Sequence, residues 1–273
     1  MNIHILHSPE EMEQVQALQR LVWPGSEADV IPVHVLLTFV HNGGLVLGAY
    51  DGQNLIGISV GFPGLYSTPD GLRPKHCSHE LGVDPHWRDS GVGFALKQAQ
   101  RQYVLAQNIN LITWTYDPLL SRNARLNIAR LGATCNTYLR ELYGEMRDGL
   151  NTGLASDRFQ VDWWIRSPHV LEKMEEILTA EKVHAAELAP LYRVLVKENF
   201  IRPPASLPAP SVSRFEAEIP ADFPALKAAD LSLARDWRFF TRELFETCFR
   251  AGYSVTDFHY NPAGPRSFYV LEK

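Results

Sequence analysis

The stretch SHELGVDPHWRDSGVGFALKQAQRQYVLA, residues 78–106, decides the fold. Residues 79–83 have the composition of a short buried strand, and the Asp-Pro pair after them turns the chain. Residues 88–93 read RDSGVG, and a helix begins there with apolar residues at a spacing of three to four. The other face of this helix is expected to be polar, with Lys97, Gln98 and Arg101. The stretch therefore predicts a strand, a glycine-bearing loop and a helix start.

The start of this helix is a candidate anion site. The first N–H groups of a helix have no partner within it, and the aligned peptide dipoles make this end mildly positive. Gly91 and Gly93 would leave these groups accessible, because a side chain at either position would obstruct an anion. An ordinary tight turn is the structural alternative. The dinucleotide-binding fingerprint does not fit, since its third glycine would fall on Leu96, and no Gly-Lys-Ser/Thr follows as in a phosphate loop.

The loop pattern is Arg88, two residues, Gly91, one residue, Gly93. It resembles the acyl-CoA-binding motif of the GNAT superfamily of N-acyltransferases. The resemblance implies that backbone N–H groups of the loop hold the pyrophosphate of coenzyme A. The binding residues implied in the loop are Arg88, Asp89, Ser90, Gly91, Val92 and Gly93. The co-substrate would be an acyl-CoA, and no metal is expected.

Composition favours a soluble globular protein. The 273 residues suffice for one large domain or two modest ones, with 45% hydrophobic and 21% charged residues. A net charge of -5 argues against a broad nucleic-acid surface. We expect no secretory signal and no membrane span, because the uncharged stretch 31–50 is interrupted by proline, histidine and glycine. Cys77, Cys135 and Cys248 lie far apart without metal-ligand spacing, which favours a reducing cytoplasm.

Local signals predict the other elements of the first half of the chain. Ser8 and Glu11 form a capping box around Pro9, and residues 51–54 form the turn of a hairpin. A Pro/Gly-rich loop is expected between this hairpin and the strand at 79–83. The predicted strands are 2–6, 45–50, 55–62, 79–83, 111–116, 135–142 and 158–165. The predicted helices start near residues 9, 33, 92 and 117, and the last of them ends at Gly132.

This is the element order of the GNAT fold. The expected fold class is therefore α/β (α+β), a mixed central sheet with splayed parallel strands plus a small C-terminal α+β module. Two central parallel strands, 80–83 and 111–116, would part and open a slot for the pantetheine arm.

Three segments are expected along the chain. The GNAT acyl-CoA-binding domain would span 1–166, a helical connector and proline-rich linker 167–212, and the C-terminal module 213–273. The elements expected in the module are a strand at 215–219, a helix at 231–251, and a hairpin of 253–260 with 267–271. Arg235, Arg238 and Arg242 of its helix are expected on a solvated face, with Glu246 one turn after Arg242. Contact with an anionic ligand is their alternative.

A closer resemblance covers most of the length. The strings SHELGV, TWTYDPLLSRNARLN, YGEM, SDRF, WRFFTRELF and GYSVTDF resemble a bacterial GNAT family associated with N-acylamino-acid racemases. The resemblance implies acyl transfer, including succinyl transfer, to the amino group of amino acids. Acetyl-CoA or succinyl-CoA would be the donor, and Trp114 would lie at the substrate.

The reaction needs a base, since only a neutral amine attacks a thioester and an α-amino group has a pKa near ~8. His79 is the favoured base, at an offset from the loop that resembles that of catalytic histidines in some GNATs. Its alternative is a structural histidine. Glu80 is the second choice, and by strand alternation it points to the other face unless a bulge re-aims it. Its alternative is a solvated or salt-bridged carboxylate. The resemblance places the thioester against the backbone of Leu81, Gly82 and Val83, and an N–H near Leu81 or Gly82 would bind the oxyanion.

The proton donor for the leaving thiolate is not evident. Many GNATs have a tyrosine four residues before the glycine that here is Gly132, and this sequence has Ile128 there. Tyr143 or Tyr116 could substitute, and a buried aromatic with a satisfied hydroxyl is the alternative for each.

Three further positions complete the expected site. Asn123 resembles the residue that hydrogen-bonds the pantetheine arm, with a helix cap as its alternative. Asp157 and Arg158 could select a substrate, since arginine pairs with a carboxylate through two bonds. An internal salt bridge is their alternative.

The sequence thus predicts an acyl-CoA-dependent N-acyltransferase acting on a small-molecule amine, with no nucleic-acid or membrane partner; a homodimer is compatible with it. A non-catalytic acyl-CoA-binding or regulatory protein is the alternative function.

Overall fold

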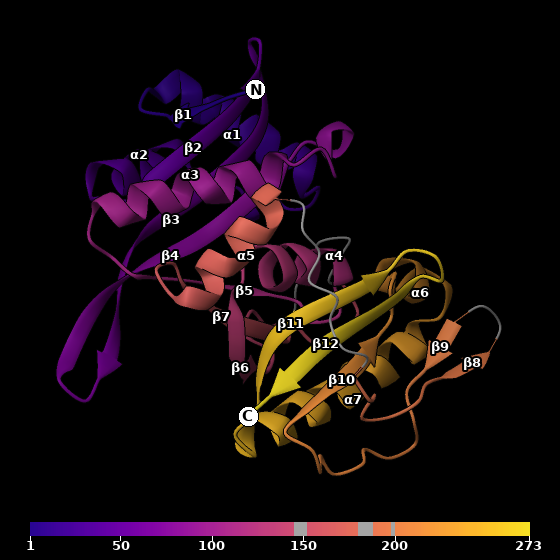
Figure 1. Cartoon of the computed structure of the whole chain (residues 1–273). Coiled ribbons are helices and arrows are strands. Elements are labelled where there is room, and N and C mark those ends of the chain that lie inside the picture. The colour runs from indigo at the N-terminus through magenta and orange to yellow at the C-terminus, as the bar shows by residue number, and fades with distance from the viewer. Residues whose placement is uncertain (145–151, 180–187, 198–199) are drawn as a thin grey trace. The chain divides into compact units, whose positions relative to one another are not determined.

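The computed structural model describes the whole chain except residues 145–151, 180–187 and 198–199 (Figure 1). The described chain forms two compact units. The first contains Met1–Trp114 and Trp164–Arg166, and the second contains the other described residues. The expected segments, divided at residues 166 and 212, are continuous in sequence, whereas the two units are grouped by contacts. Part of the expected connector falls on 180–187 and 198–199, outside the described residues.

The first unit carries the predicted order of elements. These are β1 (Asn2–Ile5), α1 (Pro9–Val22), η1 (Glu27–Asp29), α2 (Val33–His41), β2 (Leu45–Asp51), β3 (Asn54–Thr68), β4 (Gly71–Val83), η2 (Pro85–Trp87), α3 (Val92–Ala106) and β5 (Leu111–Tyr116), whose last two residues belong to the second unit. Strands β1 to β4 pair antiparallel in chain order, and β4 pairs with β5 in parallel. The mixed α/β class is confirmed.

The capping box predicted for α1 is present. Ser8 Oγ accepts a hydrogen bond from the Glu11 N–H at 3.2 Å, and the Glu11 carboxylate accepts from the Ser8 N–H at 2.9 Å. Both ends of the reciprocal pair are therefore satisfied, which fixes where α1 begins.

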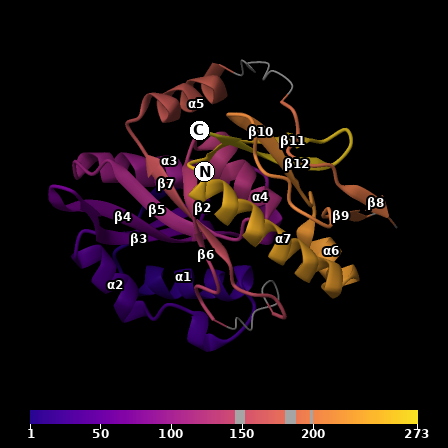
Figure 2. The ribbon, with the colours of Figure 1, turned by 90° about the horizontal axis from the view of Figure 1, so that it is seen from below.

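Helices cover both faces of β2 and β3. Val46, Ile58 and Val60 pack against α1 and α2, whereas the alternate residues Leu47 and Ile56 pack against α3. Figure 2 shows α1 and α2 on one side of β3 and α3 on the other. We name these the α1–α2 face and the α3 face. Because paired residues on neighbouring strands point to the same face of a sheet, each side chain of β4 lies on the face of its partner on β3.

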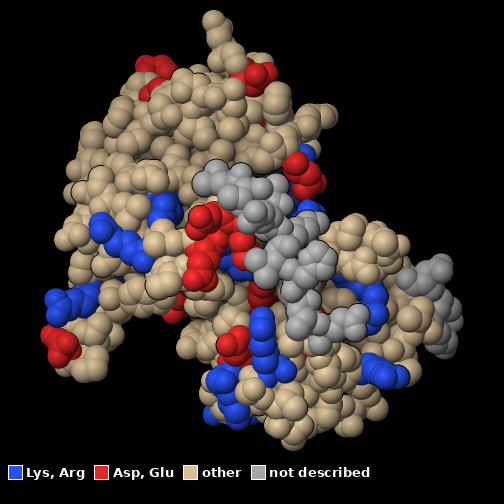
Figure 3. Space-filling view, viewed as in Figure 1, with Lys and Arg blue, Asp and Glu red and all other residues tan. Residues whose placement is uncertain are grey.

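The Pro/Gly-rich loop expected before β4 is wrong. Its residues extend β3 to Thr68 and start β4 at Gly71, and the two strands form a long hairpin that carries charged side chains at its tip (Figures 1 and 3). Pro63 and Pro74 read as loop signals, yet proline is compatible with a strand wherever its nitrogen faces away from the ladder partner.

The second unit follows the predicted order too. Its elements are α4 (Ser121–Ala124), the π-helix η3 (Arg125–Arg130), β6 (Thr134–Leu139), β7 (Arg158–Trp164), α5 (Pro168–Thr179), β8 (Leu195–Lys197), β9 (Phe200–Arg202), β10 (Arg214–Ile219), α6 (Phe223–Ala229), α7 (Leu231–Arg250), β11 (Ser254–Asn261) and β12 (Arg266–Glu272). β7, β6, β11, β12 and β10 are neighbours in that order. The sequence did not predict the hairpin of β8 and β9, or α6.

Within the described residues, no helix has the length and apolar character needed to cross a bilayer. The same residues contain no group of three or more acidic, histidine or cysteine side chains arranged to bind a metal ion.

Candidate active site

The parallel strands β4 and β5 are paired over a short distance only. The ladder joins His76 to Ile112 and Cys77 to Thr113, and no later pair between the two strands occurs in the described chain. From Ser78 onward the edge of β4 that faces β5 has lost its partner. The predicted parting of these strands is confirmed, and it leaves backbone donors and acceptors of β4 available to a ligand.

A β-bulge at His79 sets the direction of the next side chain. Gly61 of β3 pairs with Ser78 and Val60 pairs with Glu80, so His79 has no partner residue. Glu80 therefore shares the α1–α2 face with Val60. His79 lies on this face as well, since its ring centroid is 6.0 Å from that of Phe62, which stacks on Phe39 of α2. The bulge brings the two base candidates to one face.

Glu80 is a buried acid to which the described residues offer no charge partner. Its Oε2 is buried and has no hydrogen-bond partner among the described residues. Burial raises the pKa of the carboxyl to about 7. A carboxylate whose pKa is near 7 is a much stronger base than an ordinary glutamate and is still largely ionised at slightly alkaline pH.

His79 is partly covered by the protein but keeps an exposed side chain. Burial lowers the pKa of its imidazole below the ordinary value. The ring is therefore mainly neutral at pH 7 and has a lone pair with which to accept a proton. Among the described residues neither side chain has an ion-pair partner, and the role of each as base stays a prediction.

The glycine-bearing loop ends in an uncapped helix start. Gly91 is the N-cap of α3 with φ +91°, and no side chain caps the helix. Asp89 has φ +63°. A Cβ built on Gly91 meets nothing within 4 Å. Arg88, Asp89 and Ser90 are exposed. This corner has open space beside the first N–H groups of a helix that no side chain caps, as an anion site requires.

The backbone of β4 after the bulge is packed on both faces. Leu81 and Val83 pack against the α3 cluster, while Gly82 faces Trp23, whose ring would lie 3.0 Å from a Cβ at that position. A side chain larger than hydrogen would therefore displace Trp23 at the C-terminal end of α1.

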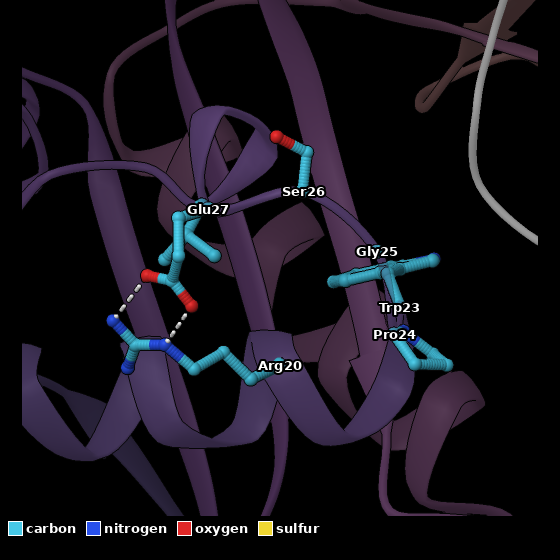
Figure 4. Close-up of a pocket in the computed structure, with 7 residues that line it drawn as sticks. Arg20, Trp23, Pro24, Gly25, Ser26 and Glu27 are labelled. Atoms are coloured by element: carbon cyan, nitrogen blue, oxygen red, sulfur yellow. Dashed lines mark hydrogen bonds and ion pairs between the residues drawn. The ribbon is translucent and has the colours of Figure 1, made fainter.

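Trp23 also lines a pocket of about 240 Å³ between the end of α1 and η1. Figure 4 shows Arg20 and Glu27 joined by two hydrogen bonds, of 2.8 and 2.9 Å, and set apart from Trp23. Because Trp23 packs on Gly82, this pocket belongs to the α1–α2 face that carries Glu80. Sequence patterns gave no sign of it, since its residues come from a helix end and a connecting segment.

The predicted polar face of α3 is wrong for Lys97. The side chain is 2% exposed, and its Nζ lies 3.7 Å from the centroid of the Trp114 ring. Trp114, which was expected at the substrate, is the first residue of β5 after the ladder with β4 ends, and it is half-buried. The sequence gave no signal for a buried lysine other than its position next to Leu96 on the apolar stripe.

The remaining predicted residues lie in the second unit. Ile128 is fully buried in η3, so the expected tyrosine position holds no acid. Tyr143 is 54% exposed and its hydroxyl lies 2.7 Å from that of Thr115. Tyr116 is buried with its hydroxyl bonded to Tyr269. Asn123 is half-buried in α4. The roles of Tyr143 and Asn123 stay predictions.

Asp157 and Arg158 are both buried in ion pairs of the second unit. Arg242 donates two hydrogen bonds of 2.8 Å to Asp157. Burial raises the pKa of Asp157, but the hydrogen bonds from Arg242, from the Glu141 N–H and from the Tyr138 hydroxyl, with the charge of Arg238, together hold the pKa below its ordinary value. Arg158 lies 3.9 Å from Asp117, which also pairs with Arg238. The expected solvated face of α7 is therefore wrong at Arg238 and Arg242. Substrate binding by Asp157 and Arg158 stays a prediction.

Comparison with known proteins gives similarity in structure only. No family model matches the sequence, and no curated protein matches it. Naa20 of Chaetomium thermophilum, solved with a bisubstrate analogue, is 14% identical; the match covers 62% of this chain and 92% of that one, with a TM-score of 0.48.

NAA60 of Arabidopsis thaliana, solved with acetyl-CoA, is 16% identical over 60% of this chain and 99% of that one, with a TM-score of 0.47. The ribosomal-protein-S18-alanine N-acetyltransferase of Escherichia coli is 14% identical over 61% and 94%, with a TM-score of 0.43. At these identities the similarity concerns the fold alone.

Proposed function

We propose that this protein is an acyl-CoA-dependent N-acyltransferase that transfers an acetyl or succinyl group to the amino group of an amino acid in the cytoplasm. The observation that carries the proposal is the free edge of β4. It begins where the ladder with β5 ends, passes the buried acid Glu80, and leads to the uncapped start of α3. The catalytic domain proposed is residues 1–166, with residues 213–273 as an accessory module.

Coenzyme A would bind along this edge. Its pyrophosphate would accept hydrogen bonds from the N–H groups of residues 90–93, and the amide groups of its pantetheine arm would pair with the backbone of β4 as a missing strand would. The thioester would then lie beside the bulge. An N–H of Leu81 or Gly82 would donate to the oxyanion that forms during attack.

The acceptor would approach from the α1–α2 face. Glu80, or His79, takes a proton from the ammonium group or from the attacking nitrogen, and the nitrogen forms a bond to the thioester carbon. The C–S bond then breaks, and the products are the amide and coenzyme A thiol. The pocket at Trp23 is on the same face, which supports acceptor binding there.

The direct test measures thiol release from acetyl-CoA and from succinyl-CoA with a panel of L- and D-amino acids. We expect turnover with at least one pair, and a loss of kcat on the order of 10²-fold in Glu80→Gln or His79→Ala, whichever residue is the base. Turnover that survives both changes in one protein contradicts the base assignment.

The alternative is a protein that binds acyl-CoA without catalysis, and the absence of tyrosine at position 128 is the observation that favours it. Thermal stabilisation by coenzyme A together with no thiol release across the panel would establish this alternative. If coenzyme A does not stabilise the protein and no thiol release is detected, both functions are contradicted.

A further inference from the structure

The α3 face of the parting strands holds a buried cation. Lys97 Nζ donates to Ser78 Oγ at 2.7 Å and to Gln100 Oε1 at 3.2 Å, and it lies over the Trp114 ring. No carboxylate comes within ion-pair distance of this nitrogen in the described part of the chain. Every partner is neutral. A buried ammonium without a counter-ion is unfavourable for folding, so a functional reason is expected for it.

The side chains next to Lys97, those of Gln100 and His76, supply no negative charge. Gln100 Nε2 lies 3.2 Å from His76 Nε2, so the imidazole is the acceptor in this bond and the amide oxygen is directed to Lys97. Burial, and then the charge of Lys97, lower the pKa of His76 to about 3, so the ring is neutral. Gly61 makes room for this ring, because a Cβ there would lie 2.2 Å from Nε2.

The cluster lies where the strands part. Ser78 is the first residue of β4 after the last ladder pair, and Trp114 is the first such residue of β5. The bulge at His79 separates the faces, so that Ser78 and Lys97 lie on the α3 face and Glu80 on the α1–α2 face. An acyl thioester seated between the strands would have the base on one side and this cation on the other.

We propose that Lys97, acting through the hydroxyl of Ser78, supplies the proton that the coenzyme A thiolate takes up as the C–S bond breaks. The proposal rests on the acyltransferase function above. The hydroxyl proton of Ser78 moves to sulfur, a proton of the Lys97 ammonium replaces it, and Lys97 is left neutral. The proton taken from the amine by the base returns to solvent, and Lys97 regains one from solvent. The sum is amine plus thioester giving amide plus thiol.

The energetics match this role. A thiol has a pKa near ~8.5, so an acid with a pKa near neutrality can protonate the departing thiolate. Burial lowers the pKa of Lys97 to about 7. Among the titratable groups described on β4, α3 and β5, His76 is the one whose pKa responds to the charge of Lys97, and it stays neutral. With Ile128 at the expected tyrosine position, Tyr143 is the other predicted donor, and its hydroxyl lies 2.7 Å from that of Thr115.

The test compares wild type with Lys97→Met and Ser78→Ala, and uses Lys75→Met, on the exposed arm of the same strand, as the control. Thiol release from acetyl-CoA and from succinyl-CoA is followed between pH 6 and 9.5 with an accepted amino acid, and coenzyme A affinity is measured separately. We expect kcat to fall on the order of 10²-fold in both variants. Coenzyme A affinity should stay within about threefold of wild type, because neither side chain is proposed to hold the nucleotide.

The pH profile separates proton donation from a structural role. Wild-type kcat should decline above about pH 7 as Lys97 loses its proton, and this decline should be absent from both variants. The control should match wild type. Should Lys97→Met fail to fold, Ser78→Ala, which removes a single oxygen, carries the test alone.

Three outcomes overturn the proposal. One is a variant kcat within twofold of wild type, and another is an alkaline decline that persists in the variants. The third is a loss confined to succinyl-CoA with acetyl-CoA unaffected, because Lys97 would then bind the carboxylate of the acyl group. Each of these leaves the acyltransferase function standing, whereas a wild type that binds coenzyme A without turnover contradicts that function itself.

Discussion

Replacing Glu80 with glutamine should make the protein more stable in alkaline solution and less active. The carboxyl is buried with one oxygen unpartnered, and its pKa rises from 4.5 to about 7. At about 1.4 kcal/mol per pKa unit, ionised Glu80 destabilises the fold by about 3 kcal/mol. Because the folded-state pKa is raised, the stability of the fold with Glu80 protonated is fully present below pH 4.5. It is lost as pH rises through 7 and the carboxyl ionises.

Glutamine has the shape of the protonated acid and never ionises. The free energy of unfolding of Glu80→Gln should therefore match that of wild type at pH 4 and exceed it by up to about 3 kcal/mol at pH 8.5, which corresponds to roughly 6–10 °C in Tm. Thermal melts at both pH values measure this, with Glu13→Gln on the exposed side of α1 as the control. Under the same conditions kcat for thiol release should fall. An equal Tm difference at the two pH values would refute the inference that Glu80 is a strained, ionisable base.

Three further changes have defined outcomes. Gly91→Ala places a side chain at φ +91° and should cost about 1 kcal/mol in chemical denaturation while weakening coenzyme A binding at least severalfold by equilibrium titration. Asp157→Asn leaves Arg242 without its buried carboxylate and should lower the free energy of unfolding by about 3–5 kcal/mol in urea, with Asp51→Asn as an exposed control. The carboxylates of Asp257 and Glu216, 3.8 and 2.7 Å from the ring, raise the pKa of His259 to about 9. The stability that His259 contributes is therefore present below pH 6.5 and lost as pH rises through 9, so His259→Gln should reduce Tm at pH 6 and not at pH 10.

Local signals predicted most elements correctly, because those signals act within a few residues. The capping box at Ser8 and the helix end at Gly132, which has φ +70°, are examples. The parting of β4 and β5 followed from the resemblance. The hairpin of β3 and β4 was missed because Pro63 and Pro74 interrupt it. A ladder tolerates proline on the side where no N–H is needed, and the sequence does not reveal which side that is.

Long-range partners account for the rest. Lys97 reads as a surface lysine of an amphipathic helix, and its partner Ser78 is 19 residues away on β4. Arg242 was expected to face solvent near Glu246, but it pairs with Asp157, 85 residues away, while Glu246 pairs with Arg140. Helical periodicity describes one element, so it cannot distinguish a charge in water from a charge buried against a distant partner.

The bulge at His79 connects these findings. A regular β4 would place Ser78 and Glu80 on the same face, since side chains alternate along a strand. One unpaired residue between them sends Ser78 to the α3 face, where Lys97 meets it, and Glu80 to the α1–α2 face, where it stays buried and unpartnered. A substrate lying in the gap between the strands would then meet a proton acceptor from one side and a proton donor from the other. Both pKa values lie near 7, so close to neutral pH part of the protein has Glu80 ionised and Lys97 protonated, which is the pair of states that base and acid need.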